Sequence, residues 1–161
     1  YHIVISLAKK YPDINFKIFG GYKPSSENQE LYYELSRTQN QLSNFSVTIN
    51  APRQQIIKTM AKSRYFLHLM RNEHFGIVVV EAMKCGMTPI VAKNSGPDEI
   101  IDFGKYGRNY KSFSGLISSF KSYLEPFPEN GQIERAFKFN KKIFRRNAKK
   151  AILSFFQAQG L

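Results

Sequence analysis

The sequence predicts an α/β fold, a doubly wound parallel sheet with helices on both faces. Helix-like and strand-like segments alternate four or five times along the chain, and short links join them. This alternation favours parallel strands that are covered by helices on both faces. The length of 161 residues suits a single domain, because a chain near 150 residues buries roughly 68–70% of its unfolded surface.

The first part of the chain predicts two helix and strand pairs. Residues 2–11 have the apolar spacing of a helix, and the Pro-Asp pair after them is a stop signal. Residues 14–19 alternate with a period of two and run into a Gly-Gly pair, which indicates a strand followed by an open loop. Residues 27–42 are polar with helical spacing, and residues 45–49 predict a short strand.

The middle of the chain predicts two further pairs. Residues 52–62 predict a helix that opens on proline, which is tolerated at the first helical position. Residues 65–70 and 88–92 are apolar enough for buried strands. Between these strands, a helix is expected over residues 77–85, because the next residue is a glycine that can end it.

The last part begins with a helix expected over residues 96–101. A glycine-rich turn with a short strand follows over residues 104–110, and a further helix is expected over 113–124. Two prolines then break the pattern, and a basic helical segment over residues 132–159 ends the chain. No internal repeat or low-complexity tract interrupts this order.

Ligands of doubly wound sheets bind beyond the carboxyl ends of the strands. The loops that follow the predicted strands should therefore share one rim. These loops are Gly20-Gly21, Asn50 to Pro52, Arg71 to Gly76 and Lys93 to Gly96.

The net charge is +12, and residues 132–151 carry eight basic residues against one acid, Glu134. A surplus of this size suggests an anionic partner. The same stretch has apolar residues at helical spacing: Ile133, Phe137, Phe144, Ala148, Ala151 and Phe155. Three interpretations remain open, namely a helix with a solvated basic face, a helix attracted to an anionic membrane surface, and nucleic-acid binding. The last is the least favoured, because no aromatic-interleaved motif accompanies the charge.

Composition excludes several classes of protein. A single cysteine, Cys85, rules out an internal disulfide and most simply serves packing. No run of about 18 apolar residues could cross a membrane, and no signal segment opens the chain, so a cytoplasmic location is expected. The chain starts with Tyr1 inside a predicted helix, which we interpret as a piece of a longer protein.

Glu73 and Glu81 form the densest chemical signal. The preceding strand brings Glu73 to the rim, and Gly76 lets the backbone approach a ligand closely. The helix then offers unpaired N–H groups to an anion. Two carboxylates beside a helix N-terminus suit a ligand with hydroxyls on both sides of a phosphate. From the residues alone, Glu73 can equally be a surface acid, and Glu81 can cap or pair within the fold.

The segment EHFGIVVVE, followed by AMKCGMTPIVAKNSGPDEI, resembles the E-x7-E signature of retaining GT-B glycosyltransferases of family 4. FKIFGGY resembles the second strand and glycine loop of that family, and APRQQIIKTMAKSRYFLHLM resembles the helix and strand before the motif. The resemblance covers about residues 1–125. It implies that residues 1–161 form the C-terminal nucleotide-sugar-binding domain, the Rossmann-like half of a GT-B fold.

The resemblance also implies a function. The full enzyme would move a hexose of the mannose or glucose type from a nucleoside-diphosphate sugar to an acceptor hydroxyl. Glu73 would be the catalytic residue, and the donor sugar would be held by Glu73, His74, Phe75 and Gly76. The nucleotide would be held by Glu81, Ile77, Val78, Gly20, Gly21, Asn50 and Ala51. No cofactor and no metal is implied, since the nucleotide sugar is a substrate.

The chain departs from the family pattern in two respects. The family has Gly-Gly where this chain has Ser95-Gly96, so this loop is expected to approach the ligand less closely. The first strand, two upstream basic residues that neutralise the diphosphate, and the N-terminal acceptor domain are absent. The acceptor, a glycan or a lipid-linked sugar, would bind that domain, and the isolated 161 residues are expected to show no turnover.

Other interpretations compete with this one. Another GT-B sugar-nucleotide enzyme, such as an epimerase or a phosphate-accepting synthase, would use the same pocket. A non-catalytic basic module that binds nucleic acid or an anionic membrane would ignore Glu73 and Glu81. We prefer the glycosyltransferase, with no nucleic-acid partner and with peripheral contact to the cytoplasmic face of a membrane through the basic segment. His68, within a predicted strand, is expected to be a satisfied core histidine.

Overall fold

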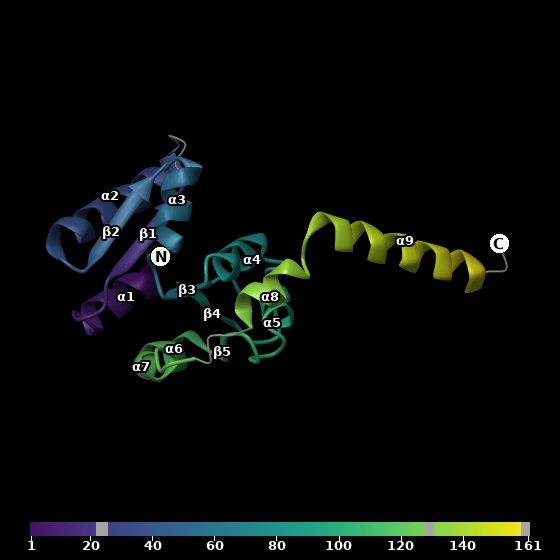
Figure 1. Cartoon of the computed structure of the whole chain (residues 1–161). Coiled ribbons are helices and arrows are strands. Elements are labelled where there is room, and N and C mark those ends of the chain that lie inside the picture. Colours follow the sequence, from purple (N-terminus) through teal and green to yellow (C-terminus); the bar gives the residue numbers. More distant parts are fainter. Residues whose placement is uncertain (22–25, 128–130, 159–161) are drawn as a thin grey trace. The chain divides into compact units, whose positions relative to one another are not determined.

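The computed structural model describes residues 1–21, 26–127 and 131–158 and confirms the predicted α/β class (Figure 1). Its strands are parallel, and helices flank them. The chain divides into two compact units. Unit 1 contains Tyr1–Lys62 and Lys111–Leu124, and unit 2 contains Ser63–Tyr110 and Glu125–Leu161.

Unit 1 is built on two parallel strands, in which Phe16 lies opposite Phe45 and Gly20 lies opposite Ile49. The strands therefore end level with each other, and the loops after them lie at one edge. The unit contains α1 (His2–Lys10), β1 (Phe16–Gly20), α2 (Ser26–Gln41), β2 (Phe45–Ile49), α3 (Arg53–Met60), α6 (Phe113–Ser118) and α7 (Phe120–Tyr123).

Two polar side chains fix α1 within unit 1. The buried amide of Asn44 donates to the backbone carbonyls at the end of α1 and beyond it, those of Ala8, Tyr11 and Ile14, at 2.9 to 3.0 Å. The hydroxyl of Tyr11 donates to the carbonyl of Ile117 in α6 at 2.9 Å. Buried polar groups are stable only when they are hydrogen-bonded, so both contacts specify where α1 ends.

Unit 2 is built on three parallel strands in the order β3-β4-β5. The central strand β4 is buried along its whole length, as its apolar sequence predicts. The apolar core of unit 2 contains Val79, Val80, Met83, Val91, Ile100, Ile101 and Ala136. The unit contains β3 (Tyr65–Leu67), α4 (Ile77–Lys84), β4 (Thr88–Ala92), α5 (Gly96–Ile100), β5 (Arg108–Tyr110), α8 (Gln132–Phe137) and α9 (Lys141–Ala158).

Two predicted helices are each divided in the structure. The helix expected over 113–124 is α6 followed by α7, with Ser119 at a non-helical φ of −117° between them. Near this break, the hydroxyls of Ser118 and Ser122 donate to the carbonyls of Gly115 and Ser119, and such bonds compete with those of the helix. The basic helical segment over 132–159 is α8 followed by α9, because the side chain of Asn140 bonds the end of one helix and the start of the other.

The strands differ from the prediction in length. The strand expected over 65–70 covers only Tyr65–Leu67, and the strand expected over 14–19 covers Phe16–Gly20. The described strands hydrogen-bond in two sets, β1-β2 in unit 1 and β3-β4-β5 in unit 2. The parallel direction and the order along the chain were predicted correctly.

Candidate functional site

Gly76 opens helix α4 in a conformation that requires glycine. Its φ is +86°, which is in the left-handed region, and it occupies the N-cap position. A Cβ atom at this position would lie 2.7 Å from Cγ of Pro97. Glycine therefore serves two purposes here, because it permits the turn into α4 and lets α5 pack against that turn.

The carboxylate of Glu73 folds back onto its own loop. Its Oε1 accepts hydrogen bonds from the backbone N–H of Phe75 at 3.1 Å and of Gly76 at 3.2 Å. The side chain is half-buried. These bonds place one carboxylate oxygen at the entrance to α4 and fix its direction, so the predicted association of Glu73 with a helix N-terminus is found in unit 2.

The loop after β4 lies against the loop of Glu73. The N–H of Gly96 donates to the backbone carbonyl of Glu73 at 2.9 Å. A Cβ atom on Gly96 would lie 1.9 Å from the carbonyl oxygen of His74 and 2.8 Å from the nitrogen of Phe75. No side chain fits in this space, so Gly96 allows the two loops to lie in backbone contact.

Serine is accommodated at position 95, where the resembled family has glycine. The backbone of Ser95 is extended, with a φ of −125°, and its buried hydroxyl donates to the carbonyl of Ala92 at 2.7 Å. The close approach between the loops is made by the second residue of the pair, Gly96. The departure from Gly-Gly therefore leaves this loop contact intact.

Asp98 holds the loop after β4 in place, and its role was not predicted from the sequence. Its side chain is fully buried, and its two oxygens accept hydrogen bonds at 2.9 Å from the backbone of Asn94 and from the side chain of Asn109. Asn94 has a φ of +61°, a conformation that these bonds help to hold. The sequence signal for this role was an acid directly after Gly-Pro at the start of a helix. If such a carboxylate is buried, it requires hydrogen-bond partners.

Helix α4 has one buried and one exposed side. Val79, Val80, Ala82 and Met83 are buried, whereas Ile77 is 68% exposed and Val78 lies at the surface. Glu81 is half-buried, one turn after Ile77. The spacing thus places Ile77, Val78 and Glu81 along the exposed side, next to the turn that carries Glu73.

The remaining predicted sugar-binding residues lie at the surface of the loop. The side chains of His74 and Phe75 are exposed. The ring of Phe75 meets the ring of Phe139 edge to face, with 6.1 Å between the ring centroids. Unit 2 therefore brings together Glu73, His74, Phe75, Gly76, Ile77, Val78 and Glu81 on one loop and the helix that follows it.

His68 lies at the carboxyl end of β3 and is buried, as expected of a core histidine. It differs from that expectation in one respect, because its Nδ1 has no hydrogen-bond partner among the described residues. Burial lowers the pKa of His68, and the nearby charge of Glu73 opposes this shift. Its carbonyl accepts a hydrogen bond from the hydroxyl of Tyr110 at 3.2 Å. Burial raises the pKa of Tyr110 to about 12, so that hydroxyl keeps its proton near neutral pH.

The lowered pKa of His68 predicts that stability falls in acid. The folded protein binds fewer protons at His68 than the unfolded chain, whose histidine titrates at 6.5. Stability from this group is therefore fully present above pH 6.5 and is lost as the pH falls from 6.5 through the lower pKa of the folded protein. The urea midpoint should drop between pH 7.5 and pH 5.5, and His68→Gln should reduce the drop. A control, His2→Gln at an exposed histidine, should keep the full drop, and an unchanged drop in His68→Gln would contradict the assignment.

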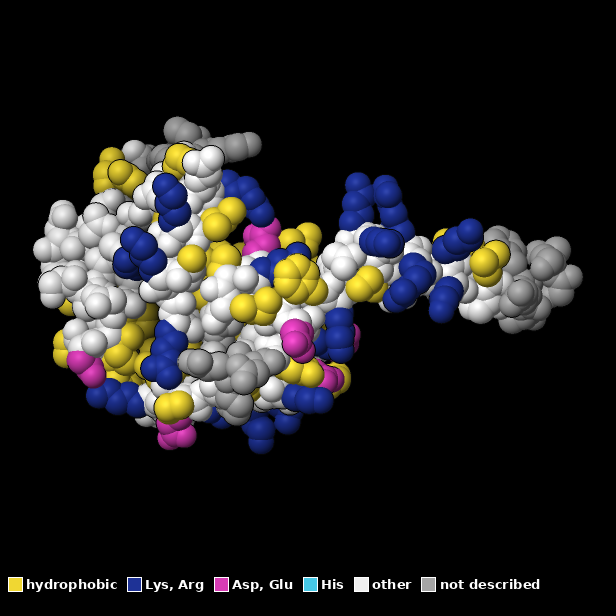
Figure 2. All heavy atoms as spheres, in the orientation of Figure 1, with side chains coloured by type: hydrophobic (Ala, Val, Ile, Leu, Met, Phe, Trp, Pro, Cys, Tyr) yellow, Lys and Arg dark blue, Asp and Glu magenta, His cyan; other side chains and the backbone are white. Residues whose placement is uncertain are grey.

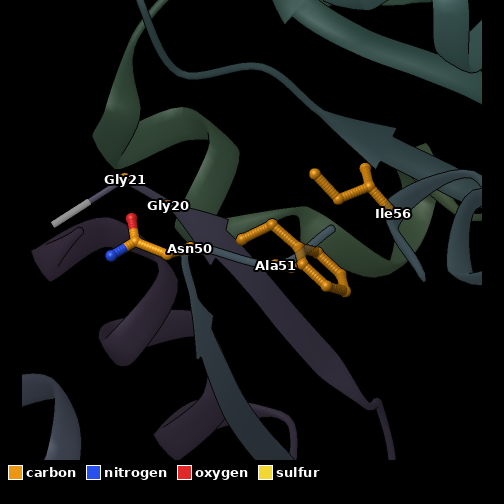
Figure 3. Close-up of a pocket in the computed structure, with 6 residues that line it drawn as sticks. Gly20, Gly21, Asn50, Ala51 and Ile56 are labelled. Atoms are coloured by element: carbon orange, nitrogen blue, oxygen red, sulfur yellow. The ribbon is translucent and has the colours of Figure 1, made fainter. Parts of the chain in front are cut away.

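The predicted nucleotide-binding residues that belong to unit 1 line a cavity of about 250 Å³ at the carboxyl ends of β1 and β2 (Figure 3). They are Gly20, Gly21, Asn50 and Ala51. The N–H of Asn50 donates to the carbonyl of Gly20 at 2.8 Å, and Asn50 has a φ of +52°. The lining residues are Phe19, Gly20, Gly21, Asn50, Ala51 and Ile56. The expectation that this edge shares one rim with the loop of Glu73 stays a prediction.

Two further observations concern metals and other hollows. Within residues 1–21, 26–127 and 131–158, no three His, Cys, Asp or Glu side chains are grouped as metal ligands would be. Independence from metals stays a prediction.

Unit 1 has a second hollow, of about 500 Å³, lined by Lys17, Lys58 and Lys62 with residues of α3. This hollow contains none of the predicted site residues.

Comparison with known proteins links this chain to one family. Residues 1–142 match the model of the family described as Glycosyl transferases group 1. A protein of Dictyostelium discoideum named GDP-Man:Man(3)GlcNAc(2)-PP-Dol alpha-1,2-mannosyltransferase is 28% identical over 136 residues, which are 76% of this chain and 27% of that protein. A Candida albicans protein of the same name is 37% identical over 81 residues, 45% of this chain and 12% of that protein.

A relative with a different name also matches part of this chain. A probable sucrose-phosphate synthase of Thermosipho melanesiensis is 37% identical over 72 residues, 44% of this chain and 15% of that protein. The matched part of this chain thus spans between 12% and 27% of the length of these three relatives.

Proposed function

We propose that this chain, which belongs to the glycosyl transferases group 1 family, is the donor-binding half of a retaining hexosyltransferase with a GT-B fold. The observation that carries the proposal is the position of Glu73. The backbone N–H groups of Phe75 and Gly76 hold one carboxylate oxygen at the start of α4. A carboxylate has a second oxygen with which to accept hydroxyl hydrogen bonds, as the recognition of a sugar requires.

The nucleotide would bind beside this carboxylate. The N–H groups of Ile77 and Val78, in the first turn of α4, suit the diphosphate, because helix N-termini attract anions. Glu81, one turn later, would accept hydrogen bonds from the ribose hydroxyls. Within unit 1, taken by itself, the cavity lined by Gly20, Gly21, Asn50 and Ala51 would accept a nucleotide base.

In transfer, the bond between the anomeric carbon and the diphosphate oxygen would break, the acceptor oxygen would bond to that carbon with retained configuration, and the leaving diphosphate would take up the proton of the acceptor hydroxyl. The chain would fix the sugar through Glu73, His74, Phe75 and Gly76, which lie on one loop. Fixed groups of this kind lower the barrier by orientation and by stabilising developing charge. The negative carboxylate of Glu73 suits the positive charge that develops at the anomeric carbon, and the amides of α4 suit the leaving diphosphate.

We infer the donor and acceptor from the named relatives. Two of them are called GDP-mannose-dependent mannosyltransferases that act on an oligosaccharide linked to PP-Dol. We therefore propose GDP-mannose as the donor and a lipid-linked sugar as the acceptor, at the cytoplasmic face of a membrane. The similarity to a probable sucrose-phosphate synthase leaves a glucose donor as the second candidate.

Calorimetry with GDP, UDP and ADP tests the proposal. We expect GDP to bind most tightly, and GDP-mannose to compete with it. Tighter binding of UDP or ADP would replace the mannose assignment by the second candidate. Binding of none of the three nucleotides to the folded protein would overturn the donor-binding function itself.

A further inference from the structure

Strand β5 ends in two residues whose side chains point to opposite faces of the sheet in unit 2. Asn109 and Tyr110 are neighbours on β5 and pair with the end of β4, and successive side chains of a strand alternate between faces. The side chain of Asn109 reaches Asp98, whereas the hydroxyl of Tyr110 reaches the backbone carbonyl of His68. The end of one strand therefore contacts both chain segments that follow β3 and β4.

The contact between Asn109 and Asp98 is sheltered from water. Asp98 is fully buried and Asn109 is half-buried, and Nδ2 of Asn109 donates to Oδ1 of Asp98 at 2.9 Å. The other oxygen of Asp98 accepts from the backbone N–H of Asn94 at 2.9 Å. Figure 2 shows acidic side chains at the molecular surface in magenta, where water hydrates them, but the buried carboxylate depends on its protein donors. Loss of either donor would leave a buried oxygen without a partner.

This contact is connected to Glu73 through the backbone. Asn94 lies two residues before Gly96, whose N–H donates to the carbonyl of Glu73 at 2.9 Å. The two loops touch at Gly96 so closely that no side chain would fit there. The carboxylate of Glu73 in turn accepts from two N–H groups of its own loop. The backbone of Glu73 and the donors to its carboxylate are therefore supported by the loop that Asp98 holds.

Tyr110 holds the start of the Glu73 loop. Its side chain is buried, and its hydroxyl donates to the carbonyl of His68 at 3.2 Å. The N–H of His68 donates to the carbonyl of Ile90 in β4 at 2.9 Å, so both backbone polar groups of His68 are bonded where β3 ends. The loop is thus fixed before Glu73 by Tyr110 and at Glu73 by Gly96.

We propose that Asn109 and Tyr110 are positioning residues, which fix the carboxylate of Glu73 in the direction that binds the donor sugar. This role rests on the proposed function, because it concerns the sugar-binding loop of that site. Neither residue has to touch the ligand, since a loop that is ordered beforehand costs less to order when the ligand binds. Their effect should therefore fall on the sugar's share of the affinity. GDP alone, held at α4 and Glu81, should depend on them far less.

Asn109→Asp and a swapped pair test the first contact by calorimetry. In Asn109→Asp two carboxylates face each other, so the bond to Asp98 is lost. The ratio of the dissociation constants of GDP-mannose and GDP should rise about 10-fold or more, the value of one hydrogen bond between the sugar and a charged group. The swapped variant Asp98→Asn/Asn109→Asp lets the amide at position 98 donate to the carboxylate at position 109, while its oxygen still accepts from Asn94. It should restore most of the ratio.

Tyr110→Phe tests the second contact. It removes only the hydroxyl and should raise the same ratio about 2- to 10-fold, as expected for a neutral hydrogen bond. The route through Glu73 is tested by combining variants. Glu73→Gln should itself raise the ratio, and Asn109→Asp should raise it no further in that background, because changes that act through one group are not additive. Independent effects of the two changes would show that Asn109 does not act through Glu73.

Controls separate positioning from a general loosening of the fold. Asn40→Asp makes the same substitution at an exposed position on α2 and should leave both dissociation constants unchanged. Circular dichroism and the urea midpoint identify the folded variants. If Asn109→Asp does not fold, the swapped pair and Tyr110→Phe decide the question.

Two results in the folded variants would overturn the inference while the unaltered protein still binds nucleotide. One is an equal loss of affinity for GDP and GDP-mannose, and the other is an unchanged ratio in both Asn109→Asp and Tyr110→Phe. A swapped pair that folds but fails to restore the ratio would remove the role of Asn109. Absence of nucleotide binding by the unaltered protein would instead overturn the proposed function, and the positioning role with it.

Discussion

Replacement of Glu81 by glutamine is expected to weaken the binding of nucleoside diphosphates by about 10- to 100-fold, since hydrogen bonds to a charged group contribute about 1.5–3 kcal/mol. A carboxylate accepts hydrogen bonds from both ribose hydroxyls, whereas an amide offers one accepting oxygen and a donor. Glu81 is half-buried beside the exposed residues Ile77 and Val78, so the loss is only partly compensated by water. Calorimetry with GDP measures the effect.

A matched variant separates this effect from a general change of charge. Glu134→Gln removes the same charge from an exposed position on α8 and should leave the dissociation constant unchanged. Circular dichroism and the urea midpoint should show that Glu81→Gln is folded. If folded Glu81→Gln binds GDP as tightly as the unaltered protein, Glu81 does not hold the ribose.

Replacement of Gly96 by alanine is expected to lower the free energy of unfolding by about 3 kcal/mol or more, an effect at the upper end of those known for overpacked positions. The new Cβ atom would lie 1.9 Å from the carbonyl oxygen of His74. The obstacle is backbone, which cannot rotate away as a side chain can. The loop of Glu73 must therefore move, and nucleotide binding should weaken together with stability.

Gly86→Ala is the control for this variant. Gly86 has a φ of +82°, but a Cβ atom there would meet nothing within 4 Å. Its replacement carries only the strain of a left-handed alanine, roughly 1–2 kcal/mol. Urea unfolding of both variants, followed by circular dichroism, gives the comparison. Equal destabilisation of the two would show that the close approach at Gly96 does not constrain the loops.

The local geometry around Glu73 was easier to predict from the sequence than the contacts that support it. The spacing of Glu73, Gly76 and Glu81 was readable because a glycine that turns into a helix and the acids on either side of that turn are local features. The bonds from Asn94 and Asn109 to Asp98 were not readable, because they join residues that only the fold brings together.

The same distinction applies to the fold. The parallel α/β class followed from alternating apolar segments, and the fully buried β4 is the clearest case. The two divided helices were missed because side chains of Ser and Asn interrupt them while the apolar spacing continues.

A comparison of GDP with its 2′,3′-dideoxy form tests whether Glu81 holds the ribose of a nucleoside diphosphate. The unaltered protein should bind the dideoxy form about 10- to 100-fold more weakly, because the carboxylate loses both hydroxyl partners. Glu81→Gln should bind the two forms with nearly equal affinity, since the partner of the hydroxyls is already impaired. Equal binding of both forms by the unaltered protein, or undiminished discrimination by Glu81→Gln, would contradict the account.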